Sequence, residues 1–371
     1  MNRNVAVAIL LVSGAFAVGC TRAEQKPRPT VAFVTNGVAD FWTIAESGAH
    51  LGGKDFDVNV EVRMPPNGPD DQRRMIEELL TIQVAGIAVS PINPLTQADI
   101  LNEAILRTNV ITQDSDAPNV KRLCYVGMDN YLAGRECGKL VKEAIPDGGE
   151  VILFVGRLGQ LNADLRRQGV IDELMDRSLD PARRDEPSAR VAGEKYIVVD
   201  TRTDNFNFSD AKAQPEDALS RYPNIKCMVG LFAYNPPYIL EAVKGAGKQD
   251  SVKVVAFDES EGTLQAIEDG TCHGTIVQNP YKYGYESIRI LAGLARGDKS
   301  VLPQDGVLYI PHRVVKKDNV REFWDDLKAK VAAGNAAQQS AASGSSTTSE
   351  APAAQESPQA TEEAADKSAG A

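Results

Sequence analysis

The chain has 371 residues, 43% of them hydrophobic, and a formal net charge of −11. This length is too great for one ordinary hydrophobic core and predicts two domains of common size. An acidic chain without a basic stripe argues against nucleic acid as a partner. No Ser-His-Asp pattern, phosphate loop or metal-ligand spacing is present, so we expect no catalytic residues, metal or cofactor.

The start of the chain is typical of an exported protein. A basic beginning is followed by an apolar run over residues 5–18, which is too short to span a bilayer as a stable helix and predicts a signal peptide over 1–19. The ending Ala17-Val18-Gly19-Cys20 resembles a bacterial lipoprotein box, with Ala17 where leucine is usual. We therefore expect a lipid on Cys20 and a polar tether over 20–29, with plain secretion as the alternative.

Apolar strands and amphipathic helices then alternate in two successive series. In the first series, strands are expected at 31–35, 58–62, 86–89, 110–112 and 123–127, with helices from about 43 and at 70–81, 97–107 and 131–144. In the second, strands are expected at 150–155, 195–200, 225–231, 252–257 and 274–278, with helices at 163–176, 211–220, 237–245, 261–269 and 283–296. Two such series predict an α/β fold with two doubly wound parallel sheets.

The composition changes near Ala332 to Ala, Ser, Thr, Gln, Pro and Glu without periodic apolar residues. Such a segment cannot bury enough surface to offset its ordering entropy, so we expect disorder over 332–371.

Four cysteines remain in the folded part of the chain, and they are Cys124, Cys137, Cys227 and Cys272. Export permits disulfides, for which three pairings are possible. Each cysteine also lies in an apolar segment, so buried free thiols are an equally acceptable interpretation.

Polar and aromatic residues gather at the carboxyl ends of the predicted strands, where open α/β sheets bind ligands. They are Asn36, Asp40, Phe41, Trp42, Asp114, Ser115, Asn162, Arg166, Phe232, Tyr234, Asn235, Asp258, Gln278 and Asn279. A carboxylate accepts from two neighbouring hydroxyls, a guanidinium donates through a fixed fork, and aromatic rings cover the C–H faces of a sugar. These residue types together favour a polyhydroxylated ligand.

Each of these residues also has a purely structural interpretation. The two aromatic residues after the first strand could cap the first helix against the sheet, and the two aspartates that follow later strands could be helix N-caps. Arg166 could pair with Asp164 or Glu173 on a solvated helix face, and Gln278 and Asn279 could form a turn. The shared position at strand ends, rather than any single residue, favours a binding site.

Six segments carry a resemblance to a known family. They are VAFVTNGVADFW (31–42), VITQDSD (110–116), YVGMDN (125–130), NADLRRQG (162–169), VVAFD (254–258) and GTIVQNP (274–280). In this order the chain resembles the ribose-binding-protein-like family of type I periplasmic sugar-binding proteins, over about residues 29–315. The resemblance implies two Rossmann-like lobes joined by a three-crossing hinge, with a sugar between them.

The resemblance also implies roles for single residues. Phe41 and Trp42 match the aromatic pair that sandwiches the sugar ring. The other sugar-contacting positions correspond to Asn36, Asp40, Asp114, Arg166, Phe206, Asn235, Asp258 and Gln278. Ser115 stands where ribose binders carry an arginine, which leaves pentose, hexose or another polyol open.

We expect residues 30–129 with 279–306 to form an N-terminal lobe, and 130–278 with 307–331 a C-terminal lobe. The implied function is a monomeric, lipid-anchored receptor of the periplasm or cell-envelope surface. It captures a pentose or hexose and delivers it to the permease of an ABC importer. One alternative is a sensor for chemotaxis or two-component signalling, and another is a glycosidase that uses Asp114 and Asp258. A repressor of the lactose-repressor type is disfavoured, because the signal peptide occupies the place of its DNA-binding domain.

Overall fold

The computed structural model describes residues 27–345. The predicted signal peptide, the Cys20 lipidation site, most of the tether and the last part of the tail lie outside these residues. Among the described helices, none combines the length and the apolar character that crossing a membrane requires.

The first sheet has six parallel strands in the order β12-β5-β4-β3-β1-β2. Its strands are β1 (Thr30–Val34), β2 (Asn59–Arg63), β3 (Gly86–Val89), β4 (Asn109–Gln113), β5 (Tyr125–Gly127) and β12 (Val307–Tyr309). Val31 and Phe33 pack under α1 (Asp40–Asp55) and α9 (Pro280–Ala295). The alternate residues of β1 pack on the other face with α2 (Pro69–Thr81) and α3 (Ala98–Arg107), as the two-residue period of a strand requires.

The second sheet has seven strands in the order β13-β11-β10-β9-β6-β8-β7. Its strands are β6 (Gly149–Val155), β7 (Val191–Ala192), β8 (Tyr196–Thr203), β9 (Ile225–Gly230), β10 (Lys253–Phe257), β11 (Gly274–Val277) and β13 (Arg313–Val315). One face packs on α4 (Asn130–Ala144) and α5 (Leu161–Leu174), and the other on α6 (Phe208–Arg221), α7 (Asn235–Gly245) and α8 (Glu261–Asp269). The central strands are parallel, as predicted, whereas the edge strands β7 and β13 pair antiparallel.

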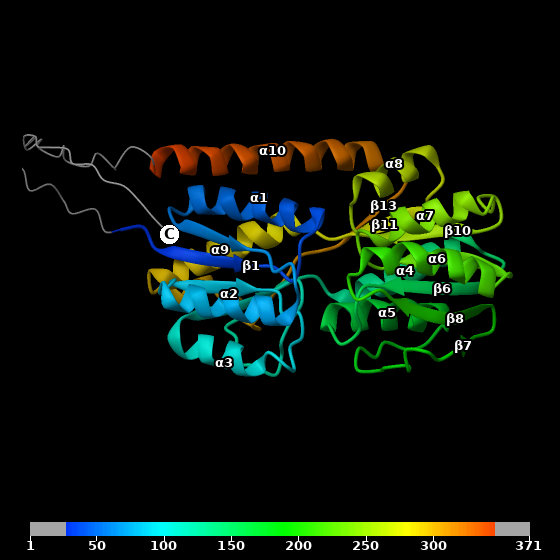
Figure 1. The fold of residues 1–371 in the computed structure, drawn as a ribbon, viewed down its shortest axis with the longest axis horizontal. Coiled ribbons are helices and arrows are strands. Elements are labelled where there is room, and N and C mark those ends of the chain that lie inside the picture. The colour runs from blue at the N-terminus through cyan, green and yellow to red at the C-terminus, as the bar shows by residue number, and fades with distance from the viewer. Residues whose placement is uncertain (1–26, 346–371) are drawn as a thin grey trace, which may run out of the picture.

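The chain passes between the two sheets three times, from β5 to α4, from β11 to α9 and from β12 to β13. Figure 1 shows the resulting two lobes side by side with these connections between them. The predicted α/β architecture of two doubly wound lobes is confirmed. One boundary was wrong, because β12 pairs with β5 and so places residues 307–309 in the first lobe. A strand of three residues is too short to show a periodic pattern in the sequence.

The predicted disorder from residue 332 is also wrong for residues 332–345, which continue the helix α10 (Val320–Ser345). The helix begins in the second lobe, where Trp324 joins the core, and then runs along α1 of the first lobe (Figure 1). Gly334 and Ala337 are buried there, and any side chain at residue 334 would collide with the backbone of Ser47. Small residues allow this close approach without producing an apolar periodicity, while alanine favours the helix.

The four cysteines outside the signal region are all buried free thiols, which decides between the two interpretations of the sequence. Cys124 lies in the core of the first lobe and the other three in the cores of the second. Burial raises the pKa of Cys124 to about 11 and that of Cys272 to about 12, so the thiols stay neutral. They act as small apolar side chains in the packing.

Candidate functional site

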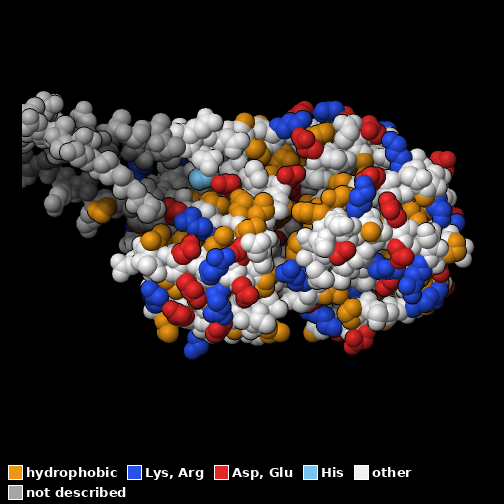
Figure 2. Space-filling view, viewed as in Figure 1, with side chains coloured by type: hydrophobic (Ala, Val, Ile, Leu, Met, Phe, Trp, Pro, Cys, Tyr) orange, Lys and Arg blue, Asp and Glu red, His pale blue; other side chains and the backbone are white. Residues whose placement is uncertain are grey.

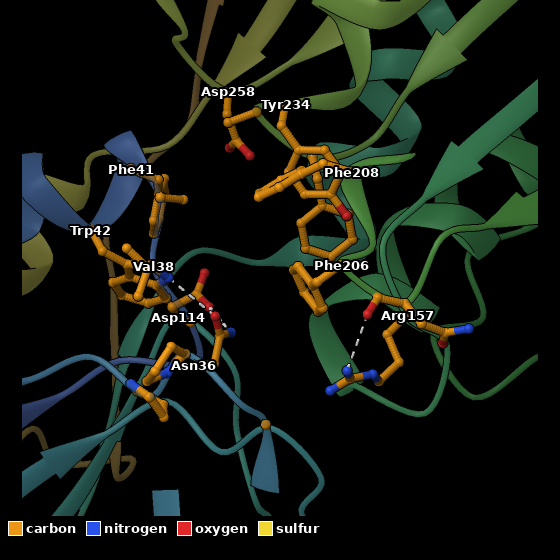
Figure 3. A pocket seen from close by; sticks show the side chains of 18 of the residues that line it. Asn36, Val38, Phe41, Trp42, Asp114, Arg157, Phe206, Phe208, Tyr234 and Asp258 are labelled. Carbon is orange, nitrogen blue, oxygen red and sulfur yellow. Dashed lines mark hydrogen bonds between the residues drawn. The ribbon is translucent and has the colours of Figure 1, made fainter. Parts of the chain in front are cut away.

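A cavity of about 490 Å³ opens between the two lobes at the carboxyl ends of both sheets. Figure 2 shows the groove between the lobes with hydrophobic side chains on both sides of it, and Figure 3 shows the cavity from close by. Nine predicted site residues line the cavity, and they are Asn36, Phe41, Trp42, Asp114, Arg166, Phe206, Tyr234, Asp258 and Gln278. Residues almost 250 positions apart in the sequence therefore meet here, as expected for the strand ends of two open α/β sheets.

Asp114 follows β4 and is held by three donors. Its Oδ2 accepts from Asn36 Nδ2 at 3.3 Å, from Ser90 Oγ at 3.0 Å and from Asn162 Nδ2 at 3.1 Å. Asn162 belongs to α5 of the second lobe, so this hydrogen bond joins the lobes directly. Burial raises the pKa of Asp114 to about 6, against the opposing effect of Arg166.

Asp258 holds the corresponding position after β10 of the second lobe. Its Oδ1 accepts from Gln278 Nε2 at 2.7 Å, and Gln278 Oε1 accepts from the Tyr283 hydroxyl at 3.1 Å. Burial raises the pKa of Asp258, while Arg166 and Gln278 oppose the shift. Ser260 caps the following helix α8, so the N-cap interpretation of Asp258 is wrong.

Arg166 lies on α5 with 1% of its surface exposed and joins the two aspartates. Its Nη2 lies 3.8 Å from Asp114 Oδ1, and its Nη1 lies 3.7 Å from Asp258 Oδ2. Nε donates to Asn130 Oδ1 at 2.8 Å and Nη1 to the Leu231 carbonyl at 3.2 Å, whereas Nη2 has no hydrogen-bond partner among the described residues. The carboxylates are too far from the guanidinium for hydrogen bonds, so both sides keep bonding capacity for a ligand hydroxyl.

Two aromatic rings compensate for the burial of this cation. The guanidinium carbon of Arg166 lies 4.5 Å from the ring centre of Phe257 and 5.5 Å from that of Phe232. Both distances are within the range of cation–π attraction. The two carboxylates and the two rings together compensate the buried charge of Arg166. Loss of one of these partners therefore leaves part of that charge uncompensated in the protein interior.

The arrangement of Phe41 and Trp42 differs from the one that the resemblance implies. Their ring centres are 4.8 Å apart and their planes are perpendicular, so no sugar ring fits between them. Consecutive helical residues point in directions about 100° apart, which prevents parallel stacking. Trp42 Nε1 also donates to Asn36 Oδ1 at 3.1 Å and thereby orients the amide that holds Asp114. The opposing wall comes from the second lobe through Phe206 and Tyr234 (Figure 3).

Four predicted site residues do not line the cavity. Asp40 is exposed at the start of α1, and Ser115 is buried beneath the site with its amide donating to Ser90 Oγ at 3.3 Å. Asn162 acts through Asp114. Asn235 turns away from the cavity, where its amide donates to Asp204 Oδ2 at 3.0 Å.

Other residues line the cavity without having been predicted. They are Gly37, Val38, Ala39, residues 65–69, Arg157, Asn205, Phe208 and Ala233. The strand-end rule covers several of them, since Arg157 comes two residues after β6 and the segment 65–69 begins two residues after β2. Phe232, which the strand-end pattern did include, comes two residues after β9 and also lines the cavity. No comparable signal marks Phe208, which begins α6.

A metal site is not apparent in residues 27–345, where no group of three or more His, Cys, Asp or Glu side chains could hold an ion. The charged side chains that line the cavity are instead the carboxylates of Asp114 and Asp258 and the guanidinium groups of Arg157 and Arg166. This set can form hydrogen bonds with neutral polar groups of a ligand.

The chain is similar to known proteins over most of its length. The ribose import binding protein RbsB of Escherichia coli (strain K12) is 24% identical over 298 residues, which cover 78% of this chain and 92% of that protein. The D-allose-binding periplasmic protein of the same organism is 23% identical over 277 residues, covering 71% and 83% respectively.

The fold is shared with solved structures. An ABC transporter solute binding protein from Burkholderia graminis C4D1M, in complex with D-arabinose, superposes with a TM-score of 0.71 at 24% identity and covers 80% of this chain and 98% of that one. GanP, a glucose-galactose binding protein from Geobacillus stearothermophilus, gives 0.70 at 22% identity over 79% and 99%. The profile of the periplasmic binding protein domain matches residues 31–299. This chain therefore belongs to the periplasmic binding protein domain family.

Proposed function

We propose that this protein captures a monosaccharide, a pentose or a hexose, between its lobes and delivers it to an ABC sugar importer. The observation that carries the proposal is the buried Arg166, whose Nη2 lacks a partner among the described residues while two carboxylates lie 3.7–3.8 Å away. Polar groups buried in this way are costly unless something completes their hydrogen bonds. A ligand with several neighbouring hydroxyls supplies both donors and acceptors at once.

Closure of the lobes follows from how the polar groups are divided. Asp114 and Asn36 belong to the first lobe, whereas Arg166 and Asp258 belong to the second. A ligand bound to both sets makes contacts in the closed state that the open state lacks. That difference in affinity is what shifts the equilibrium toward closure.

The names of the relatives support a sugar as the ligand. They include ribose, allose, xylose/arabinose and fructose binding proteins, and two of the ribose relatives are import proteins by name. At 23–24% identity these names do not choose one sugar for this chain. The carboxylate–guanidinium–carboxylate set suits pentoses and hexoses alike.

We propose further that the mature protein is a monomer held at the membrane by a lipid on Cys20. The lipoprotein-like segment before Cys20 supports this assignment. A tethered receptor would have a higher effective concentration near its permease than a free one. Mass spectrometry of the membrane fraction tests it, since the lipidated chain begins at a modified Cys20.

A second candidate function is signal sensing. One structure with a TM-score of 0.69 and 24% identity is a XylFII–LytSN complex, in which the partner chain is named LytSN. The sugar site would be the same in both functions, and only the partner of the closed lobes would differ. Pull-down with membranes from sugar-grown cells distinguishes a permease from a sensor.

The test of the sugar site is a thermal-shift screen over aldopentoses and aldohexoses, followed by calorimetry on the sugars that raise the melting temperature. A ligand at 100 times its Kd stabilises the folded form by about 2.7 kcal/mol. For Asp→Asn variants of the site, the matched control is Asp250→Asn, which changes an exposed aspartate. Absence of a shift with every sugar, or sustained hydrolysis of a glycoside by Asp114 and Asp258, contradicts the proposal.

A further inference from the structure

The cavity has two ends of different chemistry. At the deep end, Asp114, Arg166 and Asp258 are each at most 3% exposed. At the open end, Val38 of the first lobe and Phe208 of the second are 58% and 50% exposed, although both line the cavity. Large apolar side chains left in contact with water across a binding groove indicate a surface that a ligand covers.

A row of aromatic side chains connects the two ends. Phe232 stacks beside Arg166 at the deep end, and its ring centre lies 5.8 Å from that of Phe206. The Arg157 guanidinium then lies 5.1 Å from the centre of the Phe206 ring. The rings of Phe232 and Phe206 therefore lie between the buried Arg166 and the outer Arg157. Figure 3 shows Phe206 on the side of the cavity that faces Val38 across open space.

The open end offers few groups to a second sugar ring. The Tyr234 hydroxyl already donates to Asp204 Oδ1 at 2.6 Å, so this residue presents its ring to the cavity. Phe208 packs edge-on against Tyr234 with ring centres 5.4 Å apart. A planar apolar group placed against these rings gains contact, and the polar side chains that line the cavity away from the deep carboxylates include those of Asn67, Arg157 and Asn205.

Arg157 completes this chemistry. Within residues 27–345 it forms no ion pair, and its Nη2 donates only to the Asn205 carbonyl at 3.4 Å. A guanidinium that lies over one aromatic ring can also stack on, or donate to, a planar group of a ligand. The cavity volume of about 490 Å³ lies within the range of roughly 300–1,000 Å³ that is common for ligand pockets.

We infer that the ligand is a glycoside in two parts, with the sugar at the deep carboxylates and a planar aromatic aglycone between Val38 and Phe208. This inference rests on the proposed sugar-binding function and narrows it to a substrate class. The aglycone stacks on the outer aromatic rings and reaches Arg157. The open end of the cavity therefore selects for the aglycone, while the deep end selects for the sugar.

The experiment compares each aldopentose and aldohexose with its methyl and phenyl glycosides by calorimetry on the full mature chain. We expect the phenyl glycoside of the preferred sugar to bind at least tenfold more tightly than the methyl glycoside. Phe208→Ser and Val38→Ser each reduce this ratio below threefold. Leu179→Ser, which removes a 67% exposed leucine of the second lobe outside the cavity, keeps the ratio at its wild-type value.

The outcomes separate this inference from the proposed function. Binding of free sugars with a phenyl-to-methyl ratio near one overturns the inference and leaves the sugar receptor intact. The same holds if a disaccharide of the preferred sugar binds more tightly than its phenyl glycoside, or if the ratio survives both cavity variants. Absence of binding by every sugar and every glycoside overturns the proposed function together with the inference.

Discussion

Asp114 and Asp258 occupy equivalent positions in the two lobes and face the same cation. Asp114 directly follows β4 and Asp258 directly follows β10. Each has a positive φ (57° and 66°), and each lies 3.7–3.8 Å from the Arg166 guanidinium. A left-handed backbone is uncommon for residues other than glycine, although aspartate tolerates it better than most. Such conformations cluster at ligand sites, where the surrounding structure holds them in place.

The first prediction concerns these two carboxylates. Asp114→Asn and Asp258→Asn are each expected to weaken sugar binding at least tenfold, because a charged acceptor that a ligand hydroxyl uses is lost at a buried site, a cost of about 1.5–3 kcal/mol. Calorimetry with the preferred sugar measures the change. If both variants bind as tightly as the wild type and as Asp250→Asn, the site assignment is wrong.

The second prediction uses the hydrogen bond between Trp42 and Asn36. Trp42→Phe keeps a ring at the cavity but removes the Nε1 donor, so Asn36 is held less firmly against Asp114. We expect a loss of affinity of about fivefold, which corresponds to roughly 1 kcal/mol for one hydrogen bond. Trp42→Ala also removes the ring and is expected to cost at least tenfold.

Fluorescence provides an independent check, because the chain has two tryptophans and the other is Trp324 on α10. Sugar binding is expected to change the emission of wild-type protein and of Trp324→Phe. The change disappears in Trp42→Phe. A ligand-dependent signal that persists in Trp42→Phe and is lost in Trp324→Phe places the ligand elsewhere.

The sequence predicted the central residues of the site because they obey one rule. Asp114, Asp258 and Gln278 follow parallel strands, and the carboxyl ends of such strands meet at one edge of each sheet. The rule does not say which way a side chain turns. Asn235 lies five residues after β9 and donates to Asp204, and Asp40 lies on the surface at the start of α1.

The remaining features depend on distances that a sequence does not contain. The hydrogen bond from Asn162 of the second lobe to Asp114 of the first depends on the angle at which the two lobes meet. The perpendicular rings of Phe41 and Trp42 follow from the exact start of α1, which hydrophobic periodicity locates only to within a few residues. The path of α10 over α1 depends on small side chains such as Gly334, which carry no apolar signal.

The third prediction concerns pH. Burial raises the pKa of Asp114 from 3.8 to about 6, so between these values the folded state binds more protons than the unfolded state. The free energy of unfolding contributed by Asp114 therefore falls as pH rises from about 4 to 6, by about 3 kcal/mol at 1.4 kcal/mol for each pKa unit. Asp204, whose pKa burial also raises to about 6, acts in the same direction.

Urea denaturation of wild type and Asp114→Asn at pH 4, 5, 6 and 7 isolates this contribution. The wild type should lose stability relative to the variant as pH rises through this window, and a difference that does not vary with pH contradicts the assignment. Sugar affinity has the opposite dependence, because hydroxyl donors bind the ionised carboxylate. We expect the Kd to increase as the pH is lowered below about 6.

The last prediction concerns the contact of α10 with the first lobe. A side chain at residue 334 would overlap the backbone of Ser47, whereas the neighbouring Ala333 is exposed. Gly334→Leu must therefore displace the end of α10 and break the hydrogen bond from Ser47 Oγ to Asn335 Oδ1, which measures 3.1 Å. Overpacking of this kind typically costs about 1–3 kcal/mol.

Ala333→Leu is the matched control, since it adds a larger side chain one residue away on the solvent side of the same helix. Hydrogen exchange over residues 331–340 should accelerate in Gly334→Leu and remain slow in the control. Exchange around Trp324 should stay slow in both variants, because that part of α10 belongs to the core of the second lobe. Equal protection of residues 331–340 in both variants means that α10 does not depend on its contact with α1.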